Sequence, residues 1–408
     1  MKLIELHILQ SFPVSCLNRD DVGAPKSAVF GGVSRARISS QCLKRAIRDY
    51  AKSNLPAACF NGQRTKLLVP ALEQRLIRAG FTSAGANEFA KLAADYLSGL
   101  DDEQSVKTLT FLSPAEFDSI AQAIAAKKEL KALDPKIGPA REERDKDQKQ
   151  EKKDAAKIAW DKLTTEAAKQ VTKETVAKAI KQVALKDAAD IALFGRMVAS
   201  EHSLTVEGAA MFSHALSTHR ADNDIDFYSA VDEAKPKGED AGAGMIGTLE
   251  FTSAVYYRYA GLNLDMLADS LHLGALEAND RKKIVDAFIR ATLMAIPTAR
   301  HNSMNANTPP DYVLGIYKEH GQPMQLINAF EEPVWSRSGL LQPSVRKALL
   351  HQRKVEDFLA DVAHTKLATG TYQPKPDSDD KSDFKNDFIP EHVSSLGEFA
   401  KRLSAHAI

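Results

Sequence analysis

Basic side chains gather near the amino terminus of a chain that carries no net charge. The 408 residues include 54 Lys or Arg and 54 Asp or Glu, yet residues 19–52 have an excess of five positive charges. Fixed cations at this density bind the phosphates of a nucleic-acid backbone, so phosphate binding is the chemistry that this stretch predicts. The cations are Arg19, Lys26, Arg35, Arg37, Lys44, Arg45, Arg48 and Lys52.

The spacing of these cations suits a single polynucleotide strand. On a helix, Lys44 and Arg48 are one turn apart, about 6 Å along the axis, which is near the distance between successive phosphates. Residues 39–41 add polar groups at the start of that helix, where anions are favoured, and the glycines of residues 30–32 allow close backbone approach. Residue types alone leave two alternatives open: a solvated basic helix face, or a basic helix that meets an acidic partner protein.

Two adjacent carboxylates, Asp20 and Asp21, lie beside the basic stretch and raise a different hypothesis. Acids next to a nucleic-acid track can hold a metal ion that cleaves RNA, which would make the protein a metal-dependent RNA endonuclease. They can also simply orient the neighbouring Arg19. At the level of residue types, both interpretations stand.

Other metal patterns are weak. The histidines make no HExxH or His/Cys zinc motif, and the three cysteines make no CxxC. The acids of residues 222–226, with Glu233, have the spacing of a calcium loop, but Phe227 occupies the position that needs glycine. No metal and no cofactor are therefore expected.

An amphipathic helix is predicted to present the cations. Ser39 and Ser40 are suited to cap a helix that begins near Gln41. Its two faces oppose each other on a helical wheel: Leu43, Ala46, Ile47 and Tyr50 on one, and Lys44, Arg45, Arg48 and Lys52 on the other. We expect the first face to anchor the helix on a core.

Strand and loop patterns surround this helix. Alternation over residues 3–10 predicts a half-buried strand, and the Pro and Gly of residues 11–33 predict a long loop, which in a compact domain is usually functional. Periodicity predicts further strands over 248–259 and 312–317, helices over 281–296 and 342–362, charged loops over 232–247 and 374–387, and a charged helical insertion over 57–190.

Strands at the start, middle and end with helices between them predict an α+β fold with a ferredoxin-like core. The composition, 44% hydrophobic and 26% charged, is that of a soluble globular protein. No apolar run is long enough to span a membrane, and the cysteine usage fits a reducing cytoplasm.

Several blocks resemble the CasC family, the guide-RNA-binding backbone subunit of type I-E CRISPR Cascade complexes. They occur in the family's order across both ends and the middle of the chain. The blocks are residues 15–21, 26–32, 35–48, 190–197, 207–210, 215–219, 222–232, 247–253, 257–259 and 339–344. Residues 60–190 contain no family motif, residues 299–303 match only approximately, and Val33 or Ser34 stands where many relatives have a further basic residue.

The resemblance implies a hand-like subunit with an RRM-type palm, a helical finger region and a protruding thumb loop. Residues 1–56 would begin the palm, 57–190 would form the finger insertion, 191–247 would return to the palm and carry a thumb loop at about 222–244, and 248–408 would complete the palm. Copies would stack along one CRISPR RNA (crRNA), kink it, and present its bases for pairing with target DNA.

The resemblance also implies residue roles. Candidate RNA contacts are Arg19, Lys26, Arg35, Arg37, Ser39, Gln41, Lys44, Arg45 and Arg48. Met197 would be a wedge beside a displaced base, although it could instead be a core methionine. Phe227 and Tyr228 would stack in the thumb, or else staple the thumb to its own palm.

A protein of this kind would have no catalytic residue, because a recruited nuclease would cut the target. Its expected partners are crRNA, target DNA through the guide, further copies of itself, and the large, small, handle-binding and crRNA-processing endonuclease subunits. It would work in the cytoplasm and contact no membrane.

Overall fold

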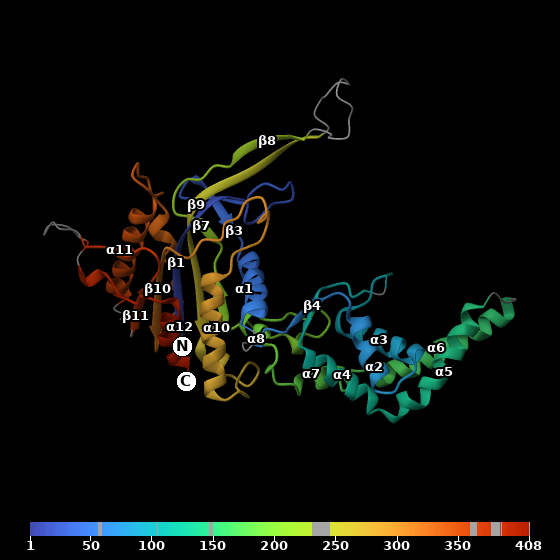
Figure 1. Cartoon of the computed structure of the whole chain (residues 1–408). Helices are drawn as coiled ribbons and strands as arrows, with labels where there is room; N and C mark the ends of the chain where they lie inside the picture. Colours follow the sequence, from blue (N-terminus) through green and yellow to red (C-terminus); the bar gives the residue numbers. More distant parts are fainter. Residues whose placement is uncertain are drawn as a thin grey trace, which may run out of the picture. The chain divides into compact units, whose positions relative to one another are not determined.

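The computed structural model describes residues 1–55, 59–103, 105–146, 150–230, 245–359, 365–376, 384 and 386–407. The chain forms two compact units (Figure 1). The first, here called the sheet unit, comprises Met1–Ala58, Ala210–Asp265 and Ala278–Ile408. The second, the helical unit, comprises Cys59–Ala209 and Met266–Glu277. The two units do not test the predicted division into palm, finger and thumb, which stays a prediction.

One large sheet organises the sheet unit. Its main path runs β12-β11-β10-β1-β9-β7-β3-β2, and β6 and β8 also pair with β9. The strands are β1 (Leu3–Ser15), β2 (Ser27–Phe30), β3 (Val33–Ile38), β6 (Ala210–Phe212), β7 (Ala215–Ser217), β8 (Asp224–Ala230), β9 (Met245–Asn263), β10 (Tyr312–Lys318), β11 (Thr365–Thr369) and β12 (Glu391–His392).

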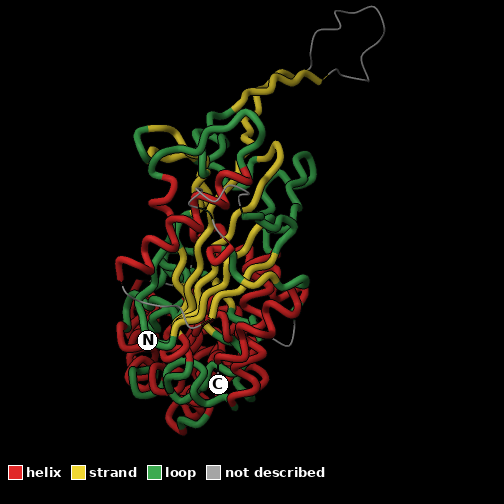
Figure 2. Tube along the Cα trace, turned by 90° about the vertical axis from the view of Figure 1, so that its left-hand side faces the viewer, coloured by secondary structure: helices red, strands yellow, loops and turns green. Residues whose placement is uncertain are grey.

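The centre of this sheet has ferredoxin-like connectivity. Along the chain the order is β1, α1 (Ser40–Asn54), β6 and β7, β9, α10 (Ala278–Met294), then β10. In the sheet, β1 lies between β9 and β10, and β6 and β7 pair with the other edge of β9, all antiparallel. The yellow strands run side by side in Figure 2. The predicted α+β fold class is confirmed.

Helices cover both faces of the sheet. One hydrophobic cluster joins Leu9, Tyr257 and Tyr312 of the strands to Val345 of α11 (Leu341–Leu359). A second cluster, on the opposite face, joins other strand residues to Leu43 of α1. The remaining helices and turns of the sheet unit are α12 (Leu396–Ser404), η3 (Ile327–Phe330), η4 (Asn386–Phe388) and η5 (Ala405–Ala407), and the short α9 (Leu264–Leu267) follows β9.

The prediction of a half-buried first strand is wrong. Residues 3–10 are all buried, because helices cover both faces of β1. Most of its polar groups have partners inside the protein, although His7 Nε2 has none among the described residues. Glu5 forms an ion pair with Lys318, Oε2 to Nζ 2.8 Å, and accepts a hydrogen bond from the Tyr259 hydroxyl. Simple alternation fails here because the second face is buried with polar groups that hydrogen-bond to one another.

Strands occupy part of the two segments predicted as loops, 11–33 and 222–244. β1 continues to Ser15, paired with β9 through a register shift between Phe12 and Ser15 that accommodates Pro13. Residues 27–30 form β2, and 224–230 form β8, paired with the start of β9. Cross-strand pairing overrides the turn-forming residue types at these positions. Residues 231–244 lie outside the described residues.

The helix predictions for the sheet unit are confirmed within a few residues. α10 ends at Met294, just before Pro297. α11 begins at Leu341 with Pro343 in its first turn, where the missing N–H is not needed. β9 is much longer than the predicted 248–259, because its first half pairs with β8 and its second half with β1. Most of the predicted loop 374–387 lies outside the described residues.

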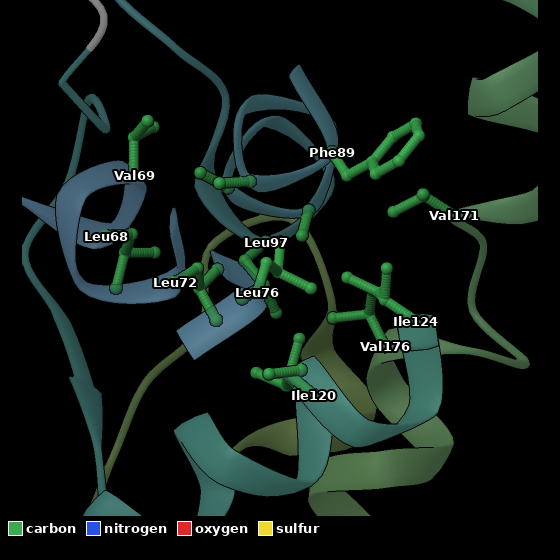
Figure 3. Close-up of a cluster of buried hydrophobic side chains, with 14 of the residues drawn as sticks. Leu68, Val69, Leu72, Leu76, Phe89, Leu97, Ile120, Ile124, Val171 and Val176 are labelled. Carbon is green, nitrogen blue, oxygen red and sulfur yellow. The ribbon is translucent and has the colours of Figure 1, made fainter. Parts of the chain in front are cut away.

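The helical unit confirms the predicted helical character of residues 57–190. Its core is apolar and includes Leu72, Phe89, Ile120 and Val176, whose side chains converge between helices in Figure 3. Its elements are β4 (Gln63–Thr65), α2 (Leu68–Arg78), α3 (Ser83–Ser98), β5 (Thr110–Leu112), α4 (Pro114–Ala125), α5 (Lys128–Asp145), α6 (Gln150–Gln170), α7 (Val176–Lys181), α8 (Ala189–Phe194) and η2 (His202–Leu204).

Candidate nucleic-acid interface

A groove of about 1420 Å³ opens on the sheet unit beside α1. Three segments line it: the loop after β1, one side of α1, and the connection from α10 to β10. Each segment contributes an arginine, namely Arg19, Arg45 and Arg300. Guanidinium groups that converge on one groove are suited to binding phosphates, because each can donate two parallel hydrogen bonds to one phosphate.

The loop that carries Arg19 is held by its own polar groups. The Asp20 carboxylate accepts hydrogen bonds from the backbone N–H groups of Val22 (3.0 Å) and Ala24 (2.9 Å). Asn18 Oδ1 accepts from the N–H of Ser39, which connects the loop to the start of α1. Arg19 itself is exposed, so a structured loop presents this guanidinium to solvent.

The helix α1 presents its cations on two different sides. Ser39 is its N-cap, as predicted, and its Oγ accepts from the Cys42 N–H. Leu43 and Ile47 are buried. Arg45 lines the groove, whereas Lys44 and Arg48 do not; Lys44 lies over the Phe212 ring, 5.6 Å from its centre.

Arg300 is the groove residue that the charge pattern missed, because it lies far along the sequence from the basic stretch. The only sequence signal was the approximate family match at 299–303. Its backbone has φ +53°, a left-handed conformation that is rare for a residue other than glycine and that often marks a functional site. Its carbonyl accepts from the N–H groups of Ser303 (3.1 Å) and Met304 (2.8 Å), which stabilise this turn.

Arg35 was predicted to contact RNA, but it has no exposed surface. Its guanidinium donates to the carbonyls of Phe30, Ser217, Phe330 and Glu331, at 3.1, 3.2, 2.8 and 3.2 Å. Burial lowers the pKa of Arg35 from its usual value. This arginine therefore joins three segments of the sheet unit and cannot reach a ligand in this structure.

The neighbouring glycine turn also packs inward. A side chain on Gly31 would collide with the Glu331 carbonyl, so the close approach at this turn is to the protein's own backbone. Gly32, at φ +74°, has open space beside it. Gly31 thus lets the β2–β3 hairpin contact the segment that Arg35 also binds.

The other predicted contacts are scattered around the start of α1. Gln41 is exposed, Lys26 and Arg37 are half-buried, and Arg37 Nε donates to the Ser27 carbonyl at 3.2 Å. Ser39 is almost fully buried as the helix cap. None of these residues lines the groove that holds Arg19 and Arg45.

The groove is not uniformly basic. Asp20, Asp21 and Asp49 also line it, which balances the three arginines in formal charge. Asp49 lies 3.6 Å from Arg45 Nε, one turn along the helix. Phosphate binding here would therefore depend on individual arginines rather than on a broad positive potential.

Three observations concern the two metal sites considered above, at Asp20 and Asp21 and at residues 222–226. The Asp20 carboxylate is engaged by two backbone N–H groups, as described above. Asp224 and Asp226 lie in strand β8 and not in a calcium-binding loop. Among the residues that the structure describes, no group of three His, Cys, Asp or Glu is arranged to hold a metal ion.

In the helical unit, Met197 is 72% exposed, which rules out the core alternative. Its neighbour Arg196 is buried and pairs with Glu116, Nη1 to Oε1 2.6 Å. Arg196 Nε also donates to the Leu204 carbonyl, and the Arg196 and Val206 backbones form a β-bridge. Burial raises the pKa of Glu116 and the arginine opposes that rise. The contacts of Arg196 therefore hold the loop in place, and the next residue, Met197, is exposed on it.

The ribbon formed by β8 and β9 carries exposed apolar side chains, and Figure 1 shows it extending from the main sheet. Phe227 is 64% exposed, so it does not staple the ribbon to the sheet. Ile225 and Ile246 lie on the same face and are also exposed. Tyr228 lies opposite Gly247, and its ring covers that glycine. A two-stranded ribbon has little stability alone, so this surface is suited to contact another molecule.

The fold and the groove define an α+β protein with a candidate phosphate-binding surface. Residues 4–395 match the family model described as CT1975-like protein, and the chain therefore belongs to that family. No curated protein is significantly similar to it in sequence. No helix in the described residues is long and apolar enough to cross a membrane.

Two solved structures resemble the whole chain. A chain of a structure described as "CRISPR RNA-guided surveillance complex, pre-nicking" is 25% identical, with a TM-score of 0.74 and 100% of both chains covered. A chain of a second "CRISPR RNA-guided surveillance complex" is 22% identical, with a TM-score of 0.64 and 99% of both chains covered, which demonstrates a shared fold.

Proposed function

We propose that this protein is a non-catalytic backbone subunit of a CRISPR surveillance complex and binds the guide RNA by its phosphates. The observation that carries the proposal is the groove in which Arg19, Arg45 and Arg300 meet. Family membership and whole-length similarity to a chain of an RNA-guided surveillance complex support it.

In the proposed mechanism, the protein binds the backbone of the guide RNA, and the bases of the guide recognise the target sequence. Arginines bind phosphates whatever the sequence, so the bases stay available for pairing with target DNA. We further propose that the complex is of type I-E, that several copies line up along one crRNA, and that the other Cascade subunits bind at the ends and sides of this row.

Two exposed features would shape the strand. Met197 would pack against a displaced base, and the β8–β9 ribbon, with Phe227 and Tyr228, would contact the kinked strand or the next copy. The exposure of Met197 and Phe227 supports these roles, because an apolar group in solvent is stabilised when a partner covers it.

The test is RNA binding by the purified protein. Its absorbance ratio should reveal bound RNA after co-expression with a guide, and its affinity for single-stranded RNA should fall steeply with salt. Replacing Arg19, Arg45 and Arg300 by Glu should lower the salt slope by about two, because each phosphate contact on a single strand contributes about 0.7. Lys401→Glu, on the exposed side of α12, controls for a single charge reversal outside the groove and is compared with each of the three single variants.

Two outcomes would contradict the proposal. If the triple variant binds like the parent, the groove does not hold RNA. If the parent cleaves RNA in a metal-dependent manner and the double variant Asp20→Ala, Asp21→Ala does not, the endonuclease alternative is correct. Charge reversal of Lys44 with Arg48 tests whether the far side of α1 also binds the strand; an unchanged affinity would remove both from the interface.

A further inference from the structure

The groove wall that carries Arg300 is a long irregular segment. Residues 294–309 run from the last residue of α10 towards β10 and include all of the groove residues that α1 and the Arg19 loop do not supply. Within it, Ala306 is buried in the core cluster on the α1 face of the sheet. A segment without regular secondary structure needs specific bonds to hold one conformation, and those bonds determine where Arg300 points.

One buried guanidinium is linked to both ends of this wall. Arg258, on β9, is 3% exposed. Its Nη2 donates to the carbonyl of Thr292 at 2.6 Å, two residues before the wall begins. Its Nη1 donates to Gln10 Oε1 on β1, and Gln10 Nε2 in turn donates to the carbonyl of Thr308 at 2.7 Å, near the end of the wall. The Thr308 hydroxyl also donates to the Ser11 carbonyl at 2.9 Å.

Burying this charge is costly. Its hydrogen bonds go to neutral oxygens, and its Nε has no partner among the described residues. Burial lowers the pKa of Arg258 to about 10, so it remains charged at neutral pH. An apolar side chain of similar size would generally stabilise such a site at least as well, which favours a role other than bulk stability.

We infer that Arg258 is a positioning residue: acting through Gln10 and Thr292, it holds the 294–309 wall so that Arg300 points into the groove. This inference rests on the proposed RNA-binding function of that groove. Arg258 touches no ligand itself. Arg45, by contrast, lines the groove itself and is carried by the regular helix α1.

A double-mutant cycle on RNA affinity separates positioning from general stability. Arg258→Met should weaken binding of a polyuridine strand about tenfold in the parent and in an Arg45→Ala background, but less than about twofold in an Arg300→Ala background, because residues in one network are non-additive. Arg258→Lys, which keeps one charged donor, should restore part of the affinity. Equal losses in all three backgrounds, or no loss at all, would overturn the inference.

Gln10→Glu provides a variant that keeps the buried arginine paired. Its carboxylate still accepts from Arg258, but it has no N–H to donate to Thr308. We expect weaker RNA binding with an unchanged unfolding midpoint. Unchanged binding would show that the Gln10 link does not position the wall.

Hydrogen exchange gives a readout that is independent of RNA. In Gln10→Glu and Arg258→Met, the amides of Ser303, Met304 and Thr308, which are bonded within the wall, should exchange faster, while those of Val22 and Ala24 should not. If the parent fails to bind RNA, the proposed function fails, yet this exchange experiment still decides the positioning role. Unchanged exchange in the wall contradicts it.

Discussion

Arg196 and Glu116 form a buried ion pair in the helical unit, with Nη1 2.6 Å from Oε1 and both side chains less than 5% exposed. Glu116 also accepts from the Ser113 N–H as part of the capping box of α4. The pair therefore connects the start of a helix to the loop that presents Met197.

Removing only Arg196 from this ion pair should strongly lower the free energy of unfolding. Arg196→Met leaves the Glu116 carboxylate buried without its partner, so we expect a loss of about 3–5 kcal/mol in the free energy of unfolding. Adding Glu116→Gln should recover most of it, because Gln is neutral and can still accept from Ser113. Urea unfolding followed by Trp160 fluorescence in a Trp335→Phe background reports on the helical unit. Equal destabilisation of the single and double variants would contradict this explanation.

Met197 should matter for RNA and not for stability. Because it is 72% exposed, Met197→Ala should change the unfolding midpoint very little. If Met197 packs on a displaced base, 2-aminopurine at that base of the bound guide should fluoresce less in Met197→Ala, because the base stacks again and stacking quenches it. In Met197→Leu the base should stay more displaced and the fluorescence higher. Ile158→Ala, at a residue 69% exposed in the same unit, is the control. Identical fluorescence in all variants would remove Met197 from the kink.

Asp49 should restrain Arg45. The two side chains lie 3.6 Å apart and are exposed, so the pair is weak, but phosphate must compete for the same guanidinium. Asp49→Asn should therefore raise RNA affinity by up to about fivefold, as expected for an exposed pair of at most about 1 kcal/mol. The matched change on α11, Asp357→Asn beside Arg353, should have no effect. A reduced affinity for Asp49→Asn would show that the carboxylate is needed by the strand.

His7 should make the sheet unit acid-sensitive. It is buried on β1, and its Nδ1 lies 2.9 Å from the Tyr257 hydroxyl, which itself accepts from the Leu326 N–H and so donates to the imidazole. Burial lowers the pKa of His7 from 6.5 to about 4. The unfolded chain therefore takes up the proton first, and stability should fall by about 3 kcal/mol as pH drops from about 6.5 to about 4, then level off.

The variant His7→Gln removes this titration, because a glutamine side chain does not titrate in this range. Its amide oxygen can still accept the hydrogen bond from Tyr257. Hydrogen exchange of the β1 amides, compared between parent and variant at each pH, measures the difference. The parent should lose protection relative to the variant between pH 6.5 and 4, the range bounded by the two pKa values. Parallel curves would mean that His7 does not titrate with folding.

Local patterns identified α1 correctly because a cap, an apolar face and a polar face are properties of adjacent residues. Ser39, Leu43 and Ile47 behave as their spacing predicts. The α+β class and the helices α10 and α11 follow for the same reason. Long-range pairing is not local, so the extension of β1 to Ser15 and the strand β8 were missed.

The candidate site was only partly predictable. A run of cations marked Arg19, Arg45 and Arg35 alike, yet the first two line a groove and the third is buried among carbonyl groups. Arg300 was missed because only the fold brings it to the same groove. The roles of the remaining predicted contacts stay predictions.

Sequence by itself determined what is encoded between neighbours: the helix caps, the amphipathic faces, the excess of positive charge near the amino terminus and the family blocks. Tertiary structure alone decided which arginines face solvent, which face carbonyls, and which distant residue completes the groove. The physical reason is that burial and convergence depend on how segments hundreds of residues apart pack together, and no local pattern of charge or hydrophobicity contains that information.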